Sequence, residues 1–394
     1  MTGRAGKLDL AARMGHIAPF EVMEIQTVAR RLEAEGRDVV HLEIGEPDFA
    51  TPAPIVEAAK RALDEKPMFY TSALGITPLR EAISRFYRER YGVEVAAERI
   101  VVTAGSSAAL LLAFGVLLDP GDEVLLADPS YPCNRHFVHA LGGLPRLVPV
   151  DSRTRYQLTP ELAREAWTPR TRIAMVASPS NPTGTMVEPG EVAALAALAR
   201  ERGGTLLADE IYHGLTYGHD ARTALEAGDD VFVINSFSKY FQMTGWRLGW
   251  LVAPVAYVRE IEKLAQNVYI SASTLAQHAA LAAFAPGTIA ILESRRRELA
   301  ARRDYLLPAL ESLGFRIAVK PEGAFYIYAD CSRLAQDSFV FAREVLEKAG
   351  VAITPGKDFG FHHPERHIRI AYTQPIARLE QAVARLGDFL AGRA

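Results

Sequence analysis

The sequence predicts an α/β protein with a large, mostly parallel sheet between helices and a smaller α+β domain. Short, continuously apolar segments alternate with helix-like segments through the middle of the 394-residue chain. Such segments are typical of strands buried on both faces, as in parallel sheets. The last hundred residues differ, because a long charged helical pattern is followed there by short strands. This change of pattern indicates a second, smaller domain.

The strands of the large domain are expected wherever a β-branched or aliphatic run ends at a polar or turn residue. Helical patterns such as Glu191–Arg202 lie between these runs, as the α/β class requires. We expect strands at Arg99–Thr103, Glu123–Ala127, Arg172–Ala177, Thr205–Ala208, Val231–Asn235 and Leu248–Val252.

The small domain is expected to combine both ends of the chain. The charged pattern Ala290–Leu313 predicts a long helix that is interrupted at Pro308. Short strands are expected after it at Arg316–Val319, Ala324–Tyr328 and His367–Ala371. Since the first ~45 residues are expected to pack beside them, we predict a large domain at 46–288 and a small domain from 1–45 and 289–394.

Composition argues against several functional classes. The formal net charge is −3 and the pI is about 6.4, whereas a general affinity for nucleic acid requires a basic excess. The two cysteines, Cys133 and Cys331, are far apart and are expected to be reduced thiols. No apolar stretch is long enough to span a bilayer, and the N-terminus has no signal-like apolar core. We therefore expect a soluble cytoplasmic protein without nucleic-acid or membrane partners.

Polar residues of catalytic type follow the predicted strands. Asn181, Asp209 and the segment 236–239 all lie at or shortly after strand ends. In open α/β sheets, ligands bind outside the carboxyl ends of the strands. These residues are therefore expected to converge on one pocket.

Lys239 has the surroundings of a lysine that forms a Schiff base, because it follows a buried strand and a serine-rich turn. Taken alone, a lysine in this position is more often a solvated loop lysine. Arg247 could clamp a phosphate or stack on the neighbouring tryptophans. Ser106 and Ser107 could bind a phosphate at a helix N-terminus or simply cap that helix.

Four further side chains are ambiguous when each is taken alone. Asp209 could pair with a protonated ring nitrogen or cap a turn, and Tyr212 could donate to a phenolate oxygen or pack half-buried. Asn181 has the composition of a turn residue. Tyr131 could stack on a planar ring or pack a loop.

Together these residues resemble one family in order and spacing. The motifs AGSSAA, PSYP, SNPTG, ADEIY, NSFSKYF and MTGWRLGW, followed by HIRIAY, span most of the chain. In this respect the chain resembles the class I aminotransferases, which are fold-type I enzymes dependent on pyridoxal 5'-phosphate (PLP). The resemblance implies a sheet of the seven-stranded type in the large domain.

The resemblance also implies a role for each motif residue. Lys239 would hold PLP as a Schiff base and move the substrate α-proton, and Asp209 would keep the pyridine nitrogen protonated. The remaining cofactor contacts would come from Tyr212, Asn181, Tyr131, Ser106, Ser107, Ser236 and Arg247. Tyr70 would reach the phosphate of a neighbouring subunit, which implies a homodimer with shared sites. The substrate α-carboxylate would be bound by Arg369, the backbone of Gly45 and Asn181.

The expected reaction is ping-pong transfer of an amino group between an L-amino acid and a 2-oxo acid. Some aspartate-specific relatives place a lysine where this chain has Ser107, which argues against strict aspartate specificity. Phe20, Tyr70, Tyr131 and Phe359 could instead line an apolar pocket. We therefore predict broad use of neutral or aromatic amino acids, with 2-oxoglutarate or pyruvate as the acceptor.

Other functions stay open on the sequence alone. Another PLP reaction on the same fold, such as a β-lyase, decarboxylase or synthase reaction, would use almost the same residues. A non-catalytic regulatory homologue is disfavoured because every expected cofactor position carries a competent residue. His362, His363 and His367 are interpreted as part of a solvated loop, and no metal site is predicted.

Overall fold

The computed structural model describes residues 10–393 and has two unequal α/β parts. The larger part contains a seven-stranded sheet with the order β2-β8-β7-β6-β5-β3-β4. Its pairs are parallel except where β8 runs antiparallel to β2 and β7. The sheet strands are β2 (Ile100–Thr103), β3 (Glu123–Asp128), β4 (Leu144–Pro149), β5 (Thr171–Ala177), β6 (Thr205–Asp209), β7 (Phe232–Ser236) and β8 (Gly249–Val252). The predicted mostly parallel sheet of seven-stranded type is confirmed.

Helices cover both faces of this sheet. Leu110 of α4 packs into the buried cluster on one face, and Leu195 of α7 packs into the cluster on the other. All residues of β2, β7 and β8 are buried, which explains their continuously apolar sequences. The helices of this part are α2 (Ala53–Glu65), α3 (Thr77–Tyr91), α4 (Ser106–Leu117), α5 (Pro132–Ala140), α6 (Pro160–Ala166), α7 (Pro189–Glu201), α8 (Val255–Val268) and α9 (Thr274–Ala280).

The smaller part is built from both ends of the described chain. It contains a three-stranded antiparallel sheet, β11-β12-β9, and a parallel pair in which β1 joins β10. The strands are β1 (Val40–His41), β9 (Tyr326–Asp330), β10 (Val351–Ala352), β11 (Thr354–Pro355) and β12 (His367–Ala371). The helices are α1 (Glu21–Ala34), α11 (Ser338–Glu344) and α12 (Ile376–Ala391). The exact domain boundaries 46–288 and 289–394 stay a prediction.

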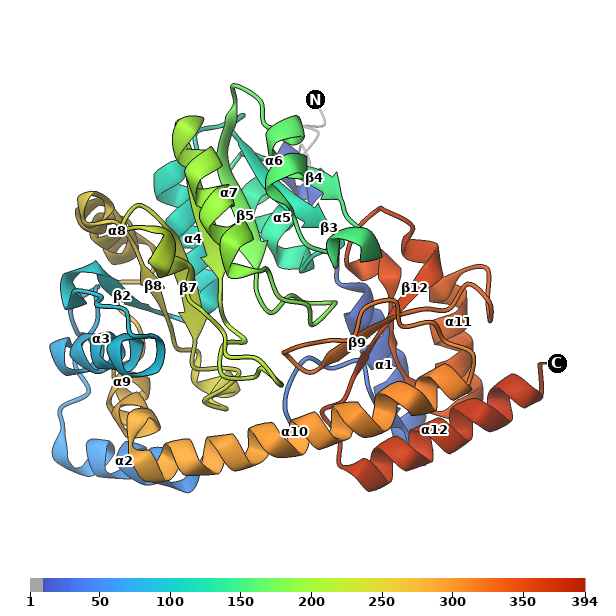
Figure 1. Cartoon of the computed structure of the whole chain (residues 1–394). Helices are drawn as coiled ribbons and strands as arrows, with labels where there is room; N and C mark the ends of the chain where they lie inside the picture. The colour runs from blue at the N-terminus through green and yellow to red at the C-terminus, as the bar shows by residue number, and fades with distance from the viewer. Residues whose placement is uncertain (1–9, 394) are drawn as a thin grey trace, which may run out of the picture.

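Helix α10 (Pro286–Ser312) joins the two parts and runs along one edge of the molecule, from α2 and α9 to α12 (Figure 1). The predicted interruption at Pro308 is wrong, because this proline lies inside the continuous helix. A proline in a helix interior costs about 3 kcal/mol. Complete burial of the neighbouring Leu306 and Leu310 offsets that cost.

Three strand predictions also need correction. Residues 316–319 form no strand, since only an isolated bridge joins Arg316 to Asp330. The strand predicted at 324–328 lies at β9, two residues later. Strand β4 was not predicted, because its sequence LPRLVP contains two prolines. Prolines are tolerated there because β4 is an edge strand.

Within residues 10–393, no single helix is long and apolar enough to cross a membrane. One bent pair, Thr274–Phe284 with Pro286–Ser312, meets the length and composition criterion and turns by 81° at its break.

Candidate active site

A cavity of about 310 Å³ lies between the carboxyl ends of the central strands and the smaller part of the molecule. Residues from β6, the turn after β7, the start of α4, the start of α1 and β12 all contribute to its walls. Ten of the predicted site residues line it: Gly45, Ser106, Ser107, Tyr131, Asn181, Asp209, Tyr212, Lys239, Arg247 and Arg369. The convergence expected from the strand ends is therefore observed.

Lys239 lies in the turn that follows β7 and directs its amine into the cavity. The Nζ atom donates a hydrogen bond to the backbone oxygen of Gly45 at 2.7 Å. Burial lowers the pKa of Lys239 from 10.5 to about 8, against the opposing effect of Glu46. A substantial fraction of the amine is thus neutral near pH 8, which is the form that attacks a carbonyl carbon.

Asp209 is the last residue of β6 and is 5 % exposed. Its Oδ1 atom accepts the backbone N–H of Ile211 at 3.1 Å. Burial raises the pKa of Asp209 from 3.8 to about 6, while that hydrogen bond and Lys239 act in the opposite direction. An ionised carboxylate that is buried from water carries a large desolvation cost unless a cation pairs with it. The site therefore favours a cationic partner for Asp209.

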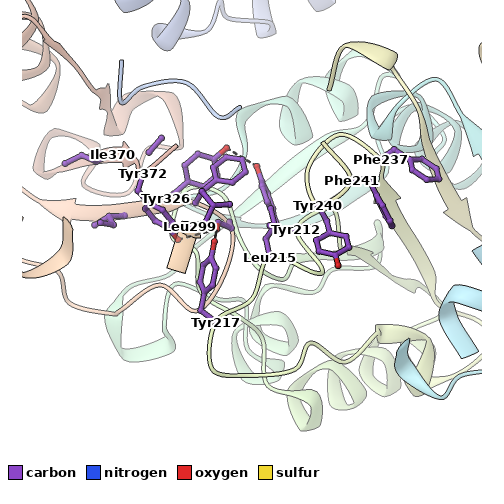
Figure 2. Packing of buried hydrophobic residues seen from close by; sticks show 14 of the residues in the cluster. Tyr212, Leu215, Tyr217, Phe237, Tyr240, Phe241, Leu299, Tyr326, Ile370 and Tyr372 are labelled. Atoms are coloured by element: carbon purple, nitrogen blue, oxygen red, sulfur yellow. Dashed lines mark hydrogen bonds between the residues drawn. The ribbon is translucent and has the colours of Figure 1, made fainter. Parts of the chain in front are cut away.

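Tyr212 shares its hydroxyl with a residue that the sequence did not single out. Its Oη lies 2.9 Å from the Oη of Tyr326, which begins β9 (Figure 2). The two rings meet edge to face, with centroids 5.8 Å apart. Tyr326 also lines the cavity. The only sequence signal was an aromatic residue in a predicted strand, which is ordinary for a core residue.

The opposite end of the cavity presents hydrogen-bond donors at the start of α4. Ser106 and Ser107 begin this helix, where backbone N–H groups have no partners within the helix. The guanidinium of Arg247 lies beside Gly105, and a Cβ atom on that glycine would come within 2.6 Å of Arg247 Nη2. Gly105 adopts a φ of +80°, which also favours glycine. The arrangement suits a phosphate group.

Ser236 is buried behind this end and does not line the cavity. Its hydroxyl accepts the backbone N–H of Ser238 at 3.0 Å and donates to the oxygen of Leu248 at 3.4 Å. Ser238 itself lines the cavity, and its hydroxyl is 3.5 Å from Arg247 Nη1. The direct phosphate contact of Ser236 therefore stays a prediction, and the structure adds Ser238 as a candidate.

Arg369 reaches the cavity from β12 and is held by three acceptors. It donates to Asn181 Oδ1 at 3.0 Å, to the backbone oxygen of Glu43 at 2.5 Å and to Thr354 Oγ1 at 3.2 Å. Its Nε atom is buried without a hydrogen-bond partner. A planar cation with unused donor capacity is suited to bind a carboxylate bidentately.

Two predicted aromatic residues differ in position. Tyr131 lines the cavity, with its ring centroid 6.3 Å from that of Phe20. Tyr70 does not line the cavity of its own chain and is 80 % exposed. Its predicted role in a neighbouring subunit therefore stays a prediction.

Comparisons with known proteins agree with this geometry. The family model "Aminotransferase class I and II" matches residues 37–386.

The chain belongs to the class I and II aminotransferase family.

Relatives of this aminotransferase match over nearly its whole length. The valine–pyruvate aminotransferase of Mycobacterium tuberculosis is 38 % identical over 97 % of this chain and 99 % of its own. The aspartate/prephenate aminotransferase of Thermus thermophilus is 36 % identical over 98 % and 99 %. The crystal structure of an aminotransferase from Mycobacterium tuberculosis superposes with a TM-score of 0.95, at 39 % identity over 98 % of this chain and 100 % of the other. The prediction of a transaminase is confirmed.

The cofactor of this aminotransferase is PLP, as in its family. The cavity residues fit this group chemically. A buried lysine of lowered pKa suits the aldehyde, and a buried carboxylate suits the ring nitrogen. The absence of a side chain at Gly105 lets the Arg247 guanidinium approach the start of α4, and together they would suit the phosphate. Within residues 10–393, no three His, Cys, Asp or Glu side chains are placed to hold a metal ion.

Proposed function

We propose that this aminotransferase moves the amino group between a neutral or aromatic L-amino acid and a 2-oxo acid, with ping-pong kinetics. One observation carries the proposal. Within the described residues, the cationic side chains that line the cavity are Lys239, Arg247 and Arg369. Each has a role in binding the cofactor or the α-carboxylate. A second substrate carboxylate would need a further cation to offset its desolvation.

The rest of the substrate wall is largely apolar. Phe20, Val22 and Met23 at the start of α1 line it, together with Ile44 and Phe359. Apolar side chains of a substrate gain about 25 cal/mol for each Å² that such a wall removes from water. The wall therefore supports neutral and aromatic donors. By the same argument a monocarboxylate such as pyruvate suits the site better than 2-oxoglutarate, which carries a second carboxylate.

The printed names of relatives support a choice between these classes. A relative that is 38 % identical is named a valine–pyruvate aminotransferase, which combines a neutral donor with a monocarboxylate acceptor. Others at 36 % identity are named aspartate/prephenate aminotransferases. The proposal is therefore decided by comparing aspartate with valine or phenylalanine as the amino donor.

The residues of the chain divide the chemical work. PLP, when bound, supplies an electron sink for the charge left by removal of the α-proton. Lys239 binds the cofactor and then accepts and returns the α-proton at its amine, for which a pKa near 8 is well placed. Asp209 holds the pyridine nitrogen in its protonated form. Arg369 and Asn181 orient the substrate through its α-carboxylate.

We also propose that the enzyme works as a cytoplasmic homodimer in which Tyr70 completes the partner's site. Tyr70 and Phe69 are 80 % and 76 % exposed, which is unusual for neighbouring large aromatic residues. The test mixes Lys239→Ala chains with Tyr70→Ala chains under refolding. A hybrid dimer has one intact site, so activity should rise above both parents. No gain from mixing would contradict shared sites.

The substrate proposal is tested with a panel of amino donors. Each half-reaction is followed by the absorbance change of the cofactor, with valine, phenylalanine, alanine and aspartate as donors. We expect kcat/KM for valine or phenylalanine to exceed that for aspartate at least about tenfold, since an unpaired carboxylate costs several kcal/mol to bury. The keto acid is measured in parallel. A preference for aspartate over every neutral donor would overturn the proposal.

A further inference from the structure

A short segment of the smaller part lines the cavity and is hydrogen-bonded to the large sheet. This 358–361 segment (residues 358–361) follows β11 in the chain. Its Phe359 is 1 % exposed and lines the cavity, with the ring centroid 4.9 Å from the guanidinium carbon of Arg369. The position of this segment thus shapes the surroundings of the arginine that is proposed to bind the α-carboxylate.

The main side-chain contact to this segment comes from Asp128, the last residue of β3. Both of its carboxylate oxygens accept the backbone N–H of Phe361, at 3.0 and 3.1 Å. Asp128 is 4 % exposed, so water competes little for this bond. The backbone N–H of Ser130 also donates to the oxygen of Phe359 at 2.9 Å. The end of β3 and the turn after it therefore bind the segment at two residues, Phe361 and Phe359.

Helix α5 adds a third contact from the large part. Arg135 Nη2 donates to the backbone oxygen of Asp358 at 3.0 Å, and its guanidinium lies 5.5 Å from the centroid of Phe361. The carboxylate of Asp358 in turn accepts the backbone N–H of Glu21 at 3.1 Å, at the start of α1. The segment thereby also fixes the helix that supplies the apolar substrate wall.

Gly360 shows how closely the two parts meet. A Cβ atom at this position would overlap the carboxylate of Asp128, with Cγ only 2.7 Å away. The backbone of Gly360 does not lie in the left-handed region, so space rather than conformation requires glycine here. Gly360→Ala should therefore push the 358–361 segment away from Asp128. It disrupts the same contact as removal of the Asp128 side chain, but by steric overlap.

We propose that Asp128 is a positioning residue for substrate binding, because it fixes the 358–361 segment and thereby the Phe359 wall beside Arg369. This inference rests on the proposed role of Arg369 in binding the α-carboxylate. Asp128 touches neither substrate nor cofactor in this account. Its loss is therefore expected to weaken substrate binding far more than it slows turnover of bound substrate.

The test compares Asp128→Ala, Gly360→Ala and Asp128→Asn as holoenzymes. The alanine variants should raise KM for the preferred amino donor about tenfold, with kcat within about threefold of wild type, as expected for loss of a charged hydrogen bond. Asp128→Asn keeps an acceptor oxygen and should restore most of the binding. Asp151→Ala is the matched control, since Asp151 caps an exposed turn nearby and accepts the N–H of Arg153. It should leave KM unchanged.

Amide hydrogen exchange provides a readout that does not depend on activity. Exchange in the 358–361 segment should become faster in Asp128→Ala and Gly360→Ala, and stay close to wild type in Asp128→Asn. Unchanged exchange, or a fall in kcat at unchanged KM, would overturn the inference. If Asp128→Ala does not fold, Gly360→Ala decides the result alone.

Arg369→Lys is measured alongside to separate the two proposals. An unchanged KM in Arg369→Lys would contradict the proposed function, whatever the Asp128 variants do. A raised KM in Arg369→Lys without one in Asp128→Ala or Gly360→Ala would overturn the positioning role alone.

Discussion

Lys239 and Asp209 approach the cavity from neighbouring strands of one sheet, whereas Arg369 approaches it from a second sheet built by the end of the chain. Strands β6 and β7 pair directly, so the spacing of the first two residues is fixed by a hydrogen-bonded ladder. Arg369 instead depends on side-chain contacts, among them its hydrogen bond to Asn181 Oδ1 of the larger part, 188 positions away in the sequence. We call Lys239 and Asp209 the cofactor half of the site, and Arg369 with its neighbours the substrate half. Sheet geometry positions the cofactor half, and contacts between the two parts position the substrate half.

This difference predicts two kinds of failure. Substitutions in the cofactor half should abolish chemistry while leaving the substrate wall in place. Substitutions in the substrate half should weaken binding and leave the cofactor bound. The first three variants below test this division, and the fourth tests a pH-dependent contact of the smaller part; they follow in order of decreasing effect.

Lys239→Ala should have the largest effect. It removes both the covalent attachment and the base, so turnover should fall on the order of 10³-fold or more. The measurement is single-turnover conversion of the amino donor, with borohydride labelling of the lysine as a second readout. Lys60→Ala is the control, because Lys60 is exposed on α2 and pairs with Glu57. Turnover within tenfold of wild type would contradict the assignment of Lys239.

Asp209→Ala should come next. Removing one partner of a buried charge pair costs about 2–5 kcal/mol, so kcat/KM should fall roughly 30- to 5 × 10³-fold. The adjacent Glu210→Gln is the control. Glu210 is equally buried but accepts hydrogen bonds from Thr223, at 3.0 Å, and from the backbone N–H of Ala224, at 2.6 Å. Because Glu210 does not line the active-site cavity, Gln should keep activity within about threefold. Equal losses in both variants would indicate a general effect of buried charge.

Arg369→Lys should affect binding rather than chemistry. A lysine keeps the charge but loses the planar fork, so KM should rise about 10- to 100-fold with kcat nearly unchanged. The cofactor absorbance should stay as in wild type. Arg366→Lys is the control, since Arg366 pairs with Asp330 and does not line the cavity. A lost cofactor signal in Arg369→Lys would break the division into two halves.

His41→Gln should have the smallest effect, and one that depends on pH. A hydrogen bond to Glu43 raises the pKa of His41 from 6.5 to about 9, and Glu33 of α1 adds to this shift. Because the folded-state pKa is raised, the stabilisation is full below pH 6.5 and is lost as the pH rises through about 9. His41 is partly exposed, so the contribution should be only about 1 kcal/mol.

The measurement for His41→Gln is the urea midpoint of both proteins at pH 6, 8 and 10. The difference between them should be largest at pH 6 and should vanish by pH 10. A difference that does not change with pH would exclude charge on His41 as its cause.

Much of the cofactor half could be predicted from the sequence because its signals are local. A buried strand that ends in Asp209, or in the turn before Lys239, can be read over about ten residues. Those residues do line one cavity. Ser236 shows the limit of such reasoning, since the same serine-rich turn sends Ser238 into the cavity and Ser236 behind it.

The substrate half was predicted less completely, because its contacts join segments that are far apart in the sequence. Tyr326, Asp358 and the backbone of Glu43 meet Arg369 or its neighbours only after distant segments pack together. The strand that begins at Tyr326 was predicted two residues too early, and Pro308 was predicted to interrupt its helix. In each case burial against a remote segment outweighed the local preference.

The sequence by itself determined the α/β class, most of the strands along the chain and which polar residues follow the strand ends. These follow from the period of apolar residues and from the turn chemistry at strand ends, which act over a few positions. Only the tertiary structure decided that Tyr326 shares a hydrogen bond with Tyr212 and that Asp128 accepts the backbone N–H of Phe361. Such contacts join residues far apart in the chain, and no local pattern encodes which of many polar groups will meet.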